Sequence, residues 1–383
     1  MMNHRRPVPA TGVRMRLGGL IATALLCLQL TACAPPEPIR IGYLGALSGR
    51  ATDLGISGLN GVHLAIDERN ATGGIKGRPI ELIEEDDRQD PEAGRRAFQK
   101  LATKGVVAVI GPMTSVIAQT IVSQANERQL PLISPTVTTA QLSGRDDYFL
   151  RIIPSTSIFA SATARHLVEQ QGARRIRPVI DLANASFSKS WLRDFSAALS
   201  ASGGTLLEPI PLIADSATDF DALARRALAE QPDSIVLITG ALDTAMLCEG
   251  IRRRHQTITL AAAEWAGTER LLEIGGRAIE GLFVAQSFER AHPAPAYRQF
   301  RAAYLKIYGH EPGFAGTNAY DATRIVLDLL AEGTPPHELK RAILARKEFP
   351  GRQRRIVLDA NGDSDGEVAM KVVRYGAYVG VAP

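Results

Sequence analysis

Cysteine is scarce in this chain, which has only three, Cys27, Cys33 and Cys248, among its 383 residues. Cys248 has neither a CxxC partner nor a nearby set of histidines. We therefore expect Cys248 to be a small buried apolar residue, and not a nucleophile or a metal ligand.

Motifs of catalysis are also missing. The sequence contains no GxSxG elbow, no Walker A loop and no GxGxxG fingerprint. His337 and Glu338 begin like a zinc motif, but Arg341 stands where the second histidine should be. Residues 361–366 look like half of a calcium loop, but Val372 occupies the position of the closing glutamate, so a hairpin turn is expected. We predict that the chain is not an enzyme and holds no metal or cofactor.

Residues 1–32 have the features of an export signal. Four arginines within residues 5–16 precede an apolar stretch, Leu17–Leu30, that is too short to span a bilayer comfortably. The stretch ends in Leu30-Thr31-Ala32-Cys33, which resembles the lipobox of bacterial lipoproteins. That resemblance implies cleavage before Cys33, lipidation of Cys33, and a membrane anchor facing the periplasm or the cell exterior. The alternative is an uncleaved anchor or an ordinary signal peptide.

Cleavage would change the charge and the cysteine content. The formal net charge is +4, and residues 1–32 carry four arginines but no lysine or acidic residue, so the remaining chain would be neutral. A nucleic-acid partner is therefore not expected. Cys27 would leave with the signal and Cys33 would carry lipid, so Cys248 could form no disulfide and the core has to be stable without one. Residues 33–37 form a short proline-containing tether.

The rest of the chain alternates between strand and helix patterns, which is typical of α/β layers with mainly parallel sheets. Its length suggests two domains. Expected strands are residues 39–46, 79–84, 106–110 and 130–134, then 177–182, 205–210, 234–239, 258–263 and 282–287. Expected helices include residues 57–70, a helix capped by Asp90, 115–128, a helix capped near Asp219, 294–308 and 316–331. Residues 354–379 are expected to form a strand, a turn and a strand.

The turn at residues 111–115 joins a buried strand to a helix. Free backbone N–H groups and the helix dipole favour a bound carboxylate at such a point. Open α/β sheets also bind ligands outside the carboxyl ends of their strands. Thr114 and Ser115 could instead serve only as helix N-caps, and the turn alone does not decide between the two.

Several short motifs occur in a characteristic order and spacing. They are Ile41–Gly49, Asn70–Gly77, Asp86-Asp87 with Asp90-Pro91, Val109–Pro112, Ile133–Pro135 and Asn318–Ala322. With these motifs the chain resembles the bacterial substrate-binding proteins of branched-chain amino acid ABC importers, which have the type I periplasmic binding protein fold. The resemblance covers nearly all of the chain after the leader.

This resemblance implies an α/β fold of two Rossmann-like lobes joined by three hinge segments, with the ligand in the cleft between them. The first lobe would comprise residues 38–154 plus 288–349, and the second residues 155–287 plus 350–383. The chain would be a monomer that delivers its ligand to a membrane permease.

The resemblance also implies a site for an amino acid head group. Ser115 matches the serine that holds the ligand carboxylate, and Thr138 matches the threonine that contacts the head group. Thr136 matches a position whose backbone carbonyl accepts a hydrogen bond from the ligand's ammonium group. Glu264 matches the acid that pairs with this ammonium group. A zwitterion that leaves water needs donors at one end, and acceptors with one negative charge at the other. Without the alignment, Glu264 would be an ordinary surface acid.

The pocket for the ligand side chain departs from the family pattern. Leu54 stands where the family often has an aromatic ring, and Phe187 matches a second ring position. Thr114 adjoins Ser115 in the expected site, and some members join the positions of Gln89 and Thr114 by a disulfide. These departures leave the identity of the bound side chain open.

The leading expectation is a receptor for an amino acid with a branched-chain or other aliphatic side chain. A receptor for an aromatic or other carboxylate, or for an amide, would keep Ser115 and leave Glu264 without an ammonium partner. A non-transport lipoprotein of the same fold that acts as an interaction protein is a further alternative.

Overall fold

The computed structural model describes residues 1–4, 7 and 36–381. The chain divides into two compact units, Met1–Glu37 and Pro38–Pro383, and the fold described below is that of the second. Most of the predicted export signal, together with Cys33, lies outside the described residues. Within the described residues, no helix has both the length and the apolar character needed to cross a membrane.

Five strands of the described chain form a parallel sheet in the order β2-β1-β3-β4-β5. They are β1 (Ile39–Gly45), β2 (Ile80–Asp86), β3 (Val109–Ile110), β4 (Leu132–Ser134) and β5 (Phe149–Arg151). Every residue of β3, β4 and β5 is buried. Such continuous burial is expected for parallel strands that are covered on both faces.

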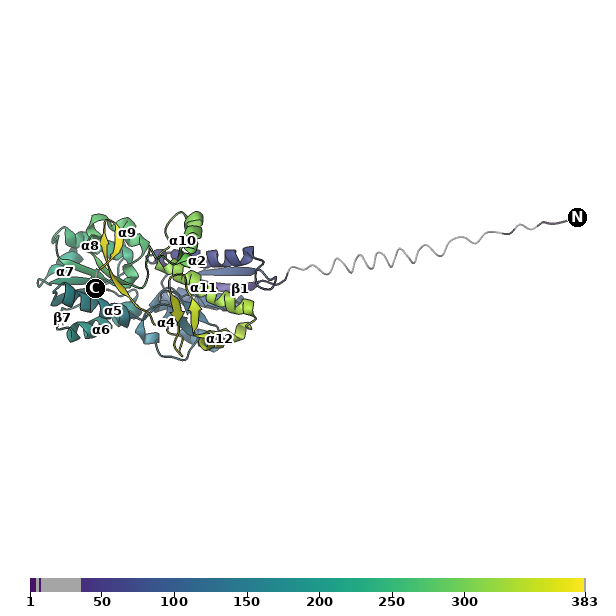
Figure 1. The fold of residues 1–383 in the computed structure, drawn as a ribbon, viewed down its shortest axis with the longest axis horizontal. Helices are drawn as coiled ribbons and strands as arrows, with labels where there is room; N and C mark the ends of the chain where they lie inside the picture. The colour runs from purple at the N-terminus through teal and green to yellow at the C-terminus, as the bar shows by residue number, and fades with distance from the viewer. Residues whose placement is uncertain (5–6, 8–35, 382–383) are drawn as a thin grey trace. The chain divides into compact units, whose positions relative to one another are not determined.

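Helices from two distant parts of the chain pack around this sheet. They are α2 (Thr52–Ala71), α3 (Pro91–Thr103) and α4 (Ser115–Arg128), then α10 (Pro295–Tyr308), α11 (Phe314–Glu332) and α12 (Leu339–Arg346). Helix α11 lies along α2, as Figure 1 shows. A Cβ atom on Gly61 would lie 2.1 Å from the carbonyl oxygen of Gly316, so the two helices can approach this closely only because residue 61 is glycine.

A second, eight-stranded sheet of the described residues has the order β15-β14-β11-β10-β9-β6-β7, with β8 also paired to β6. The strands are β6 (Arg175–Asp181), β7 (Thr205–Leu206), β8 (Ile210–Leu212), β9 (Ser234–Ile238), β10 (Thr259–Ala262), β11 (Phe283–Gln286), β14 (Ala369–Arg374) and β15 (Ala377–Gly380). The accompanying helices are α5 (Thr156–Arg165), η2 (His166–Gln170), α6 (Ala185–Ala201), α7 (Phe220–Leu228), α8 (Ala241–Arg252) and α9 (Glu269–Gly275). Short turns of helix are η1 (Ala140–Leu142), η3 (Glu264–Ala266), η4 (Gly276–Ile279) and η5 (Pro336–Glu338).

Within the described residues, the chain passes between the two sheet systems after β5, after β11 and again before β14. A small antiparallel ladder of β12 (Glu348–Pro350) and β13 (Arg355–Val357) precedes the last passage. The α/β class with two mainly parallel sheets is therefore confirmed. The exact limits of the lobes, at residues 154, 287 and 349, remain a prediction.

Several local expectations differ from the structure, and the strand expected at residues 205–210 is in fact two short strands, β7 and β8. Helix α2 begins at Thr52 and not at Ser57. Its buried face carries Gly55, Gly58 and Gly61, and glycine weakens the helix signal although close packing requires it here. Strand β3 covers only Val109–Ile110, the residues that pair with β1 and β4. The C-terminal segment forms strands in two different sheets, because β13 pairs with β12 while β14 and β15 extend the second sheet.

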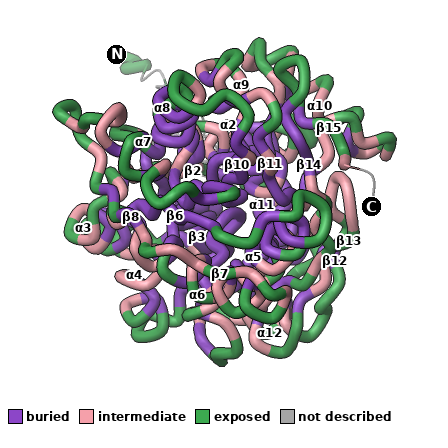
Figure 2. The backbone as a smooth tube through the Cα atoms, turned by 90° about the vertical axis from the view of Figure 1, so that its left-hand side faces the viewer, coloured by how far each residue is buried: buried purple, intermediate pink, exposed green. Residues whose placement is uncertain are grey.

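The core follows the strands, and the exposed residues lie mainly on the outer helices and loops (Figure 2). Cys248, on α8, is a free cysteine and has no exposed surface. Burial raises the pKa of its thiol to about 12, so the thiol stays protonated and unreactive at neutral pH. The expectation of an apolar core residue is confirmed.

Arg151, the last residue of β5, connects three segments near the predicted site. Its Nε lies 2.8 Å from Oδ1 of Asp363, and its side chain is only 1% exposed. Its Nη1 donates to the carbonyl oxygen of Thr139 at 2.9 Å, and its backbone N–H donates to Gly362. Asp363 lies in the segment that was expected to be a hairpin turn. An antiparallel bridge between Leu358 and Ser364 closes this turn.

Replacing Arg151 with methionine should lower the free energy of unfolding. The Asp363 carboxylate would lose its buried partner, and we expect a loss of about 2–4 kcal/mol because Asp363 keeps some contact with water. Urea denaturation followed by circular dichroism measures this change. As a control, Arg355→Met removes an exposed ion pair with Glu348 and should change stability little. Equal effects of the two substitutions would contradict the assigned importance of Arg151.

Candidate functional site

The loops after β3 and β4 are tied to each other at the carboxyl edge of the first sheet. The Ser134 hydroxyl donates to the carbonyl oxygen of Pro112 at 2.8 Å, and the Thr136 hydroxyl donates to that of Met113 at 2.7 Å. Gly111 has a φ of +121°, and a Cβ atom there would lie 2.2 Å from the carbonyl oxygen of Leu44. Only glycine fits this turn, which leads directly into α4.

Thr114 and Ser115 lie at the start of α4, and each is only 2% exposed. Thr114 has the extended backbone of an N-cap residue, but its side chain accepts no capping hydrogen bond. Its hydroxyl is buried and has no partner among the described residues. Such a group costs free energy unless something else bonds to it, so a purely capping role does not account for Thr114.

Asn184 brings a second helix to the same place. It is the N-cap residue of α6, yet its side chain does not cap α6. Its Oδ1 instead accepts from the backbone N–H of Val116, in the first turn of α4, at 3.1 Å. The N-termini of α4 and α6 therefore face one another, and both contribute positive potential there. Asn184 was not predicted to be part of the site, although an asparagine between a strand and a helix is a recognisable N-cap signal.

Glu264 follows β10 and begins η3. It is 6% exposed, so the alternative of a surface acid is wrong. Its Oε1 accepts from the hydroxyl of Thr138 at 3.0 Å, and its Oε2 accepts from Nε1 of Trp191 at 2.8 Å. Burial raises the pKa of its carboxyl to about 7, although these hydrogen bonds favour the charged form. Among the described residues, this acid has no positively charged partner.

All residues predicted to contact the ligand line a common cavity, which we name the inner cavity. It is lined by Leu54, Thr114, Ser115, Thr136, Thr138, Phe187 and Glu264, together with Met113, Asn184, Trp265 and Phe314. Glu264 is the only ionisable acid or base in this set of described residues. The cavity volume is about 10 Å³, which is room for about one water molecule. An amino acid with an aliphatic side chain can enter only if the walls move apart.

Aromatic rings form much of the wall. Phe187 and Trp265 meet edge to face, with ring centroids 5.5 Å apart and an interplanar angle of 80°. Phe314, at the start of α11, completes the wall on another side. Trp265 and Phe314 were not predicted, because an aromatic residue in an apolar segment is more often part of a core than of a site.

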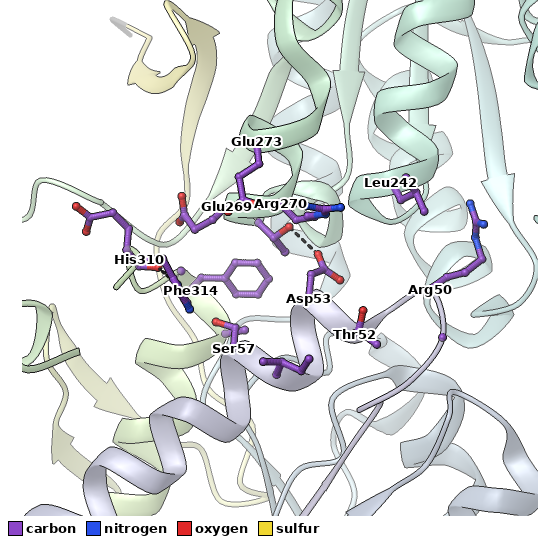
Figure 3. A pocket seen from close by; sticks show the side chains of 16 residues that line it. Arg50, Thr52, Asp53, Ser57, Leu242, Glu269, Arg270, Glu273, His310 and Phe314 are labelled. Atoms are coloured by element: carbon purple, nitrogen blue, oxygen red, sulfur yellow. Dashed lines mark hydrogen bonds and ion pairs between the residues drawn. The ribbon is translucent and has the colours of Figure 1, made fainter. Parts of the chain in front are cut away.

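A larger outer cavity of about 440 Å³ lies beyond Phe314 (Figure 3). Its charged residues are paired with one another or with neighbouring side chains. The Thr268 hydroxyl donates to Asp53 at 2.7 Å, and Arg50 forms an ion pair with Asp243. Because most of these charges are paired within the described residues, the outer cavity has the character of a polar entrance. No group of three or more His, Cys, Asp or Glu side chains in the described residues is arranged to hold a metal ion.

Comparison with known proteins agrees with this geometry. The family model described as periplasmic binding protein matches residues 38–351. The Leu/Ile/Val-binding protein BraC3 of Rhizobium johnstonii is 29% identical over 359 residues, which cover 91% of this chain and 95% of that protein. The leucine-specific-binding protein of Salmonella typhimurium is 25% identical over 265 residues, which cover 69% of this chain and 71% of that protein.

Solved structures share the fold. The branched-chain amino acid transporter substrate binding protein LivJ from Streptococcus pneumoniae, in complex with isoleucine, matches with a TM-score of 0.81 at 22% identity, covering 91% of this chain and 100% of that chain. A solute binding protein of an ABC transporter from R. palustris, in complex with benzoate, also matches with a TM-score of 0.81, at 18% identity, covering 90% of this chain and 96% of that chain. These structures confirm the type I periplasmic binding protein fold.

The motifs, the two mainly parallel sheets and the family match all lead to the same assignment, and the resemblance inferred from the sequence is confirmed. The chain belongs to the periplasmic binding protein family.

Proposed function

We propose that this protein is an extracytoplasmic, lipid-anchored receptor of an ABC importer that captures an amino acid, with a branched-chain or other aliphatic side chain, in the cleft between its lobes. The observation that carries the proposal is the inner cavity itself. It combines a buried acid without a counter-charge, Glu264, with the N-terminus of α4 and an unpaired hydroxyl, that of Thr114.

The charge pattern of the inner cavity is complementary to a zwitterion. Ser115 and Thr114 offer hydroxyl groups at the N-terminus of α4, where a carboxylate is favoured by the helix dipole. Glu264 offers a carboxylate that would gain a partner from an ammonium group. Thr136 would contribute its backbone carbonyl, since its hydroxyl is already bonded to Met113. A ligand with only one of these charges would leave one end of the site unpaired.

Contacts across the cleft support capture by closure. Four contacts join residues before position 155 to residues after it. The pairs are Thr138 and Glu264, Val116 and Asn184, Asp53 and Thr268, and Arg50 and Asp243. We infer that these contacts belong to a closed state of the receptor. Because the inner cavity holds about one water molecule in this state, capture requires these contacts to open and to form again around the ligand.

A second candidate is a receptor for an aromatic carboxylate. Phe187, Trp265 and Phe314 line the inner cavity, and the benzoate-bound protein of R. palustris shares the fold. In this case the carboxylate would still bind at α4, and Glu264 would remain bonded to Thr138 and Trp191 without a cation. The two candidates differ in one property, which is whether the amino group of the ligand contributes to affinity.

Calorimetric titration tests the proposed function. The protein, freed of endogenous ligand by unfolding and refolding, should bind at least one of L-leucine, L-isoleucine, L-valine and L-alanine at a single site. Benzoate and leucinamide, which each lack one of the two charges, should bind more weakly because one end of the site stays unpaired. Tight binding of benzoate would favour the second candidate. No binding across the twenty amino acids and common carboxylates would eliminate the receptor function.

Ser115→Ala and Glu264→Gln should each weaken amino acid binding by more than about tenfold, or about 1.4 kcal/mol. The first removes a donor to the carboxylate, and the second removes the negative charge opposite the ammonium. Thr120→Ala is a matched control, because Thr120 lies on the same helix α4 but bonds only to the carbonyl oxygen of Val116. Wild-type affinity in both site variants, measured by calorimetry, would refute the assignment of the site.

Cys33→Ala should release the protein from membranes. Cys33 would carry the lipid chains, and the described residues include no helix able to span a bilayer. Cell fractionation followed by immunoblotting measures the distribution. Cys248→Ala serves as the control, since Cys248 is buried and should not affect anchoring. A Cys33→Ala protein that still sediments with membranes would contradict the lipid anchor.

A further inference from the structure

Trp191 contacts the acid of the site from outside the inner cavity. Its Nε1 donates to Oε2 of Glu264 at 2.8 Å, and its side chain has no exposed surface. Its indole stacks on the ring of Phe195, with centroids 5.0 Å apart and planes 18° from parallel. Trp191 is not among the described residues that line the inner cavity.

The two donors to Glu264 come from different parts of the fold. Trp191 lies on α6, which follows β6, and Glu264 follows β10; both strands belong to the second sheet. Thr138 follows β4 of the first sheet. If the lobes separate, the bond from Thr138 must break, whereas the bond from Trp191 joins two segments of the same lobe and persists.

We propose that Trp191 is a positioning residue that holds the Glu264 carboxylate in place for an ammonium group before the lobes close, and that it thereby sets the preference for amino acids over carboxylic acids without an amino group. This inference rests on the proposed function. It adds a residue to which neither the family resemblance nor the lining of the cavity points.

The surroundings of Glu264 explain why this one N–H matters. The groups that face it from α2, α4 and α11 and from the loops after β3 and β4 are hydroxyl, aliphatic and aromatic. From α6, Asn184 and Phe187 face it, and beside β11 an adjoining small cavity adds Gln286, Ser287 and Phe288. None of these groups carries a charge. Before a ligand arrives, donated hydrogen bonds are therefore what stabilises and orients the negative charge.

The test compares L-leucine with 4-methylpentanoate, the same molecule without the amino group. In the wild-type protein, the dissociation constant of 4-methylpentanoate divided by that of L-leucine measures the contribution of the ammonium group to affinity. Trp191→Phe keeps the stacking on Phe195 but removes the N–H, and should lower this ratio by about tenfold, mainly by weakening L-leucine. If another amino acid binds more tightly than L-leucine in the titrations, the comparison uses that amino acid and its analogue without the amino group.

Phe195→Leu is the matched control. It disturbs the packing beneath Trp191 while leaving the indole N–H in place, so it should lower affinity for both molecules alike and leave the ratio unchanged. An unchanged ratio in Trp191→Phe, or an equal drop in Phe195→Leu, would overturn the positioning role. If the wild-type protein binds no amino acid, the proposed function itself fails, and that result is distinct from a failure of this inference.

A measurement without ligand tests the contact directly. The chain has only two tryptophans, so in Trp265→Phe the emission reports Trp191 alone. This emission should change with pH as Glu264 gains its proton, and the added substitution Glu264→Gln should abolish that change. Superimposable pH profiles with and without Glu264→Gln would show that the contact is absent in the free protein, and would overturn the inference.

Discussion

Burying the carboxylate of Glu264 is the physical constraint around which the site is organised. An acid that leaves water loses several kcal/mol of hydration unless donors or a cation replace it. Here a hydroxyl from one sheet system and an indole N–H from the other replace part of that hydration. The raised pKa, near 7, shows that this replacement is incomplete. Under the proposed function, the ammonium group of the ligand would complete it, so the same imbalance would account for both ligand attraction and lobe closure.

The opposite end of the cavity has the complementary property. Helices α4 and α6 direct their N-termini toward it, and a buried hydroxyl there has no partner within the described residues. Under the proposed function, the head group would be recognised through its two charges, which all amino acids share. Selection among side chains would then fall to Leu54, Phe187, Trp265 and Phe314, which line the same cavity. One scaffold can therefore change its specificity by repacking this wall.

Much of this arrangement was predictable from the sequence. The order of the motifs predicted the fold class, and residue matching predicted the side chains that meet in the inner cavity. Asn184 and Trp191 were missed because each bonds to a residue far away along the chain, and no local pattern encodes such a pairing. The start of α2 was missed because Gly55, Gly58 and Gly61 allow close contacts with Ala46, Met113 and Gly316, a tertiary reason that weakens the helix signal. The small volume of the inner cavity depends on contacts between residues far apart along the chain, which sequence patterns do not describe.

The isolation of Cys248 has a practical consequence. Its thiol is enclosed in the core and protonated at neutral pH, so thiol-reactive dyes will not reach it in the folded protein. A form that begins after residue 33 would have no other cysteine. Dyes placed at one new surface cysteine on each side of the cleft would then report the distance between the lobes in real time, and the receptor could serve as a sensor for whatever molecule it captures.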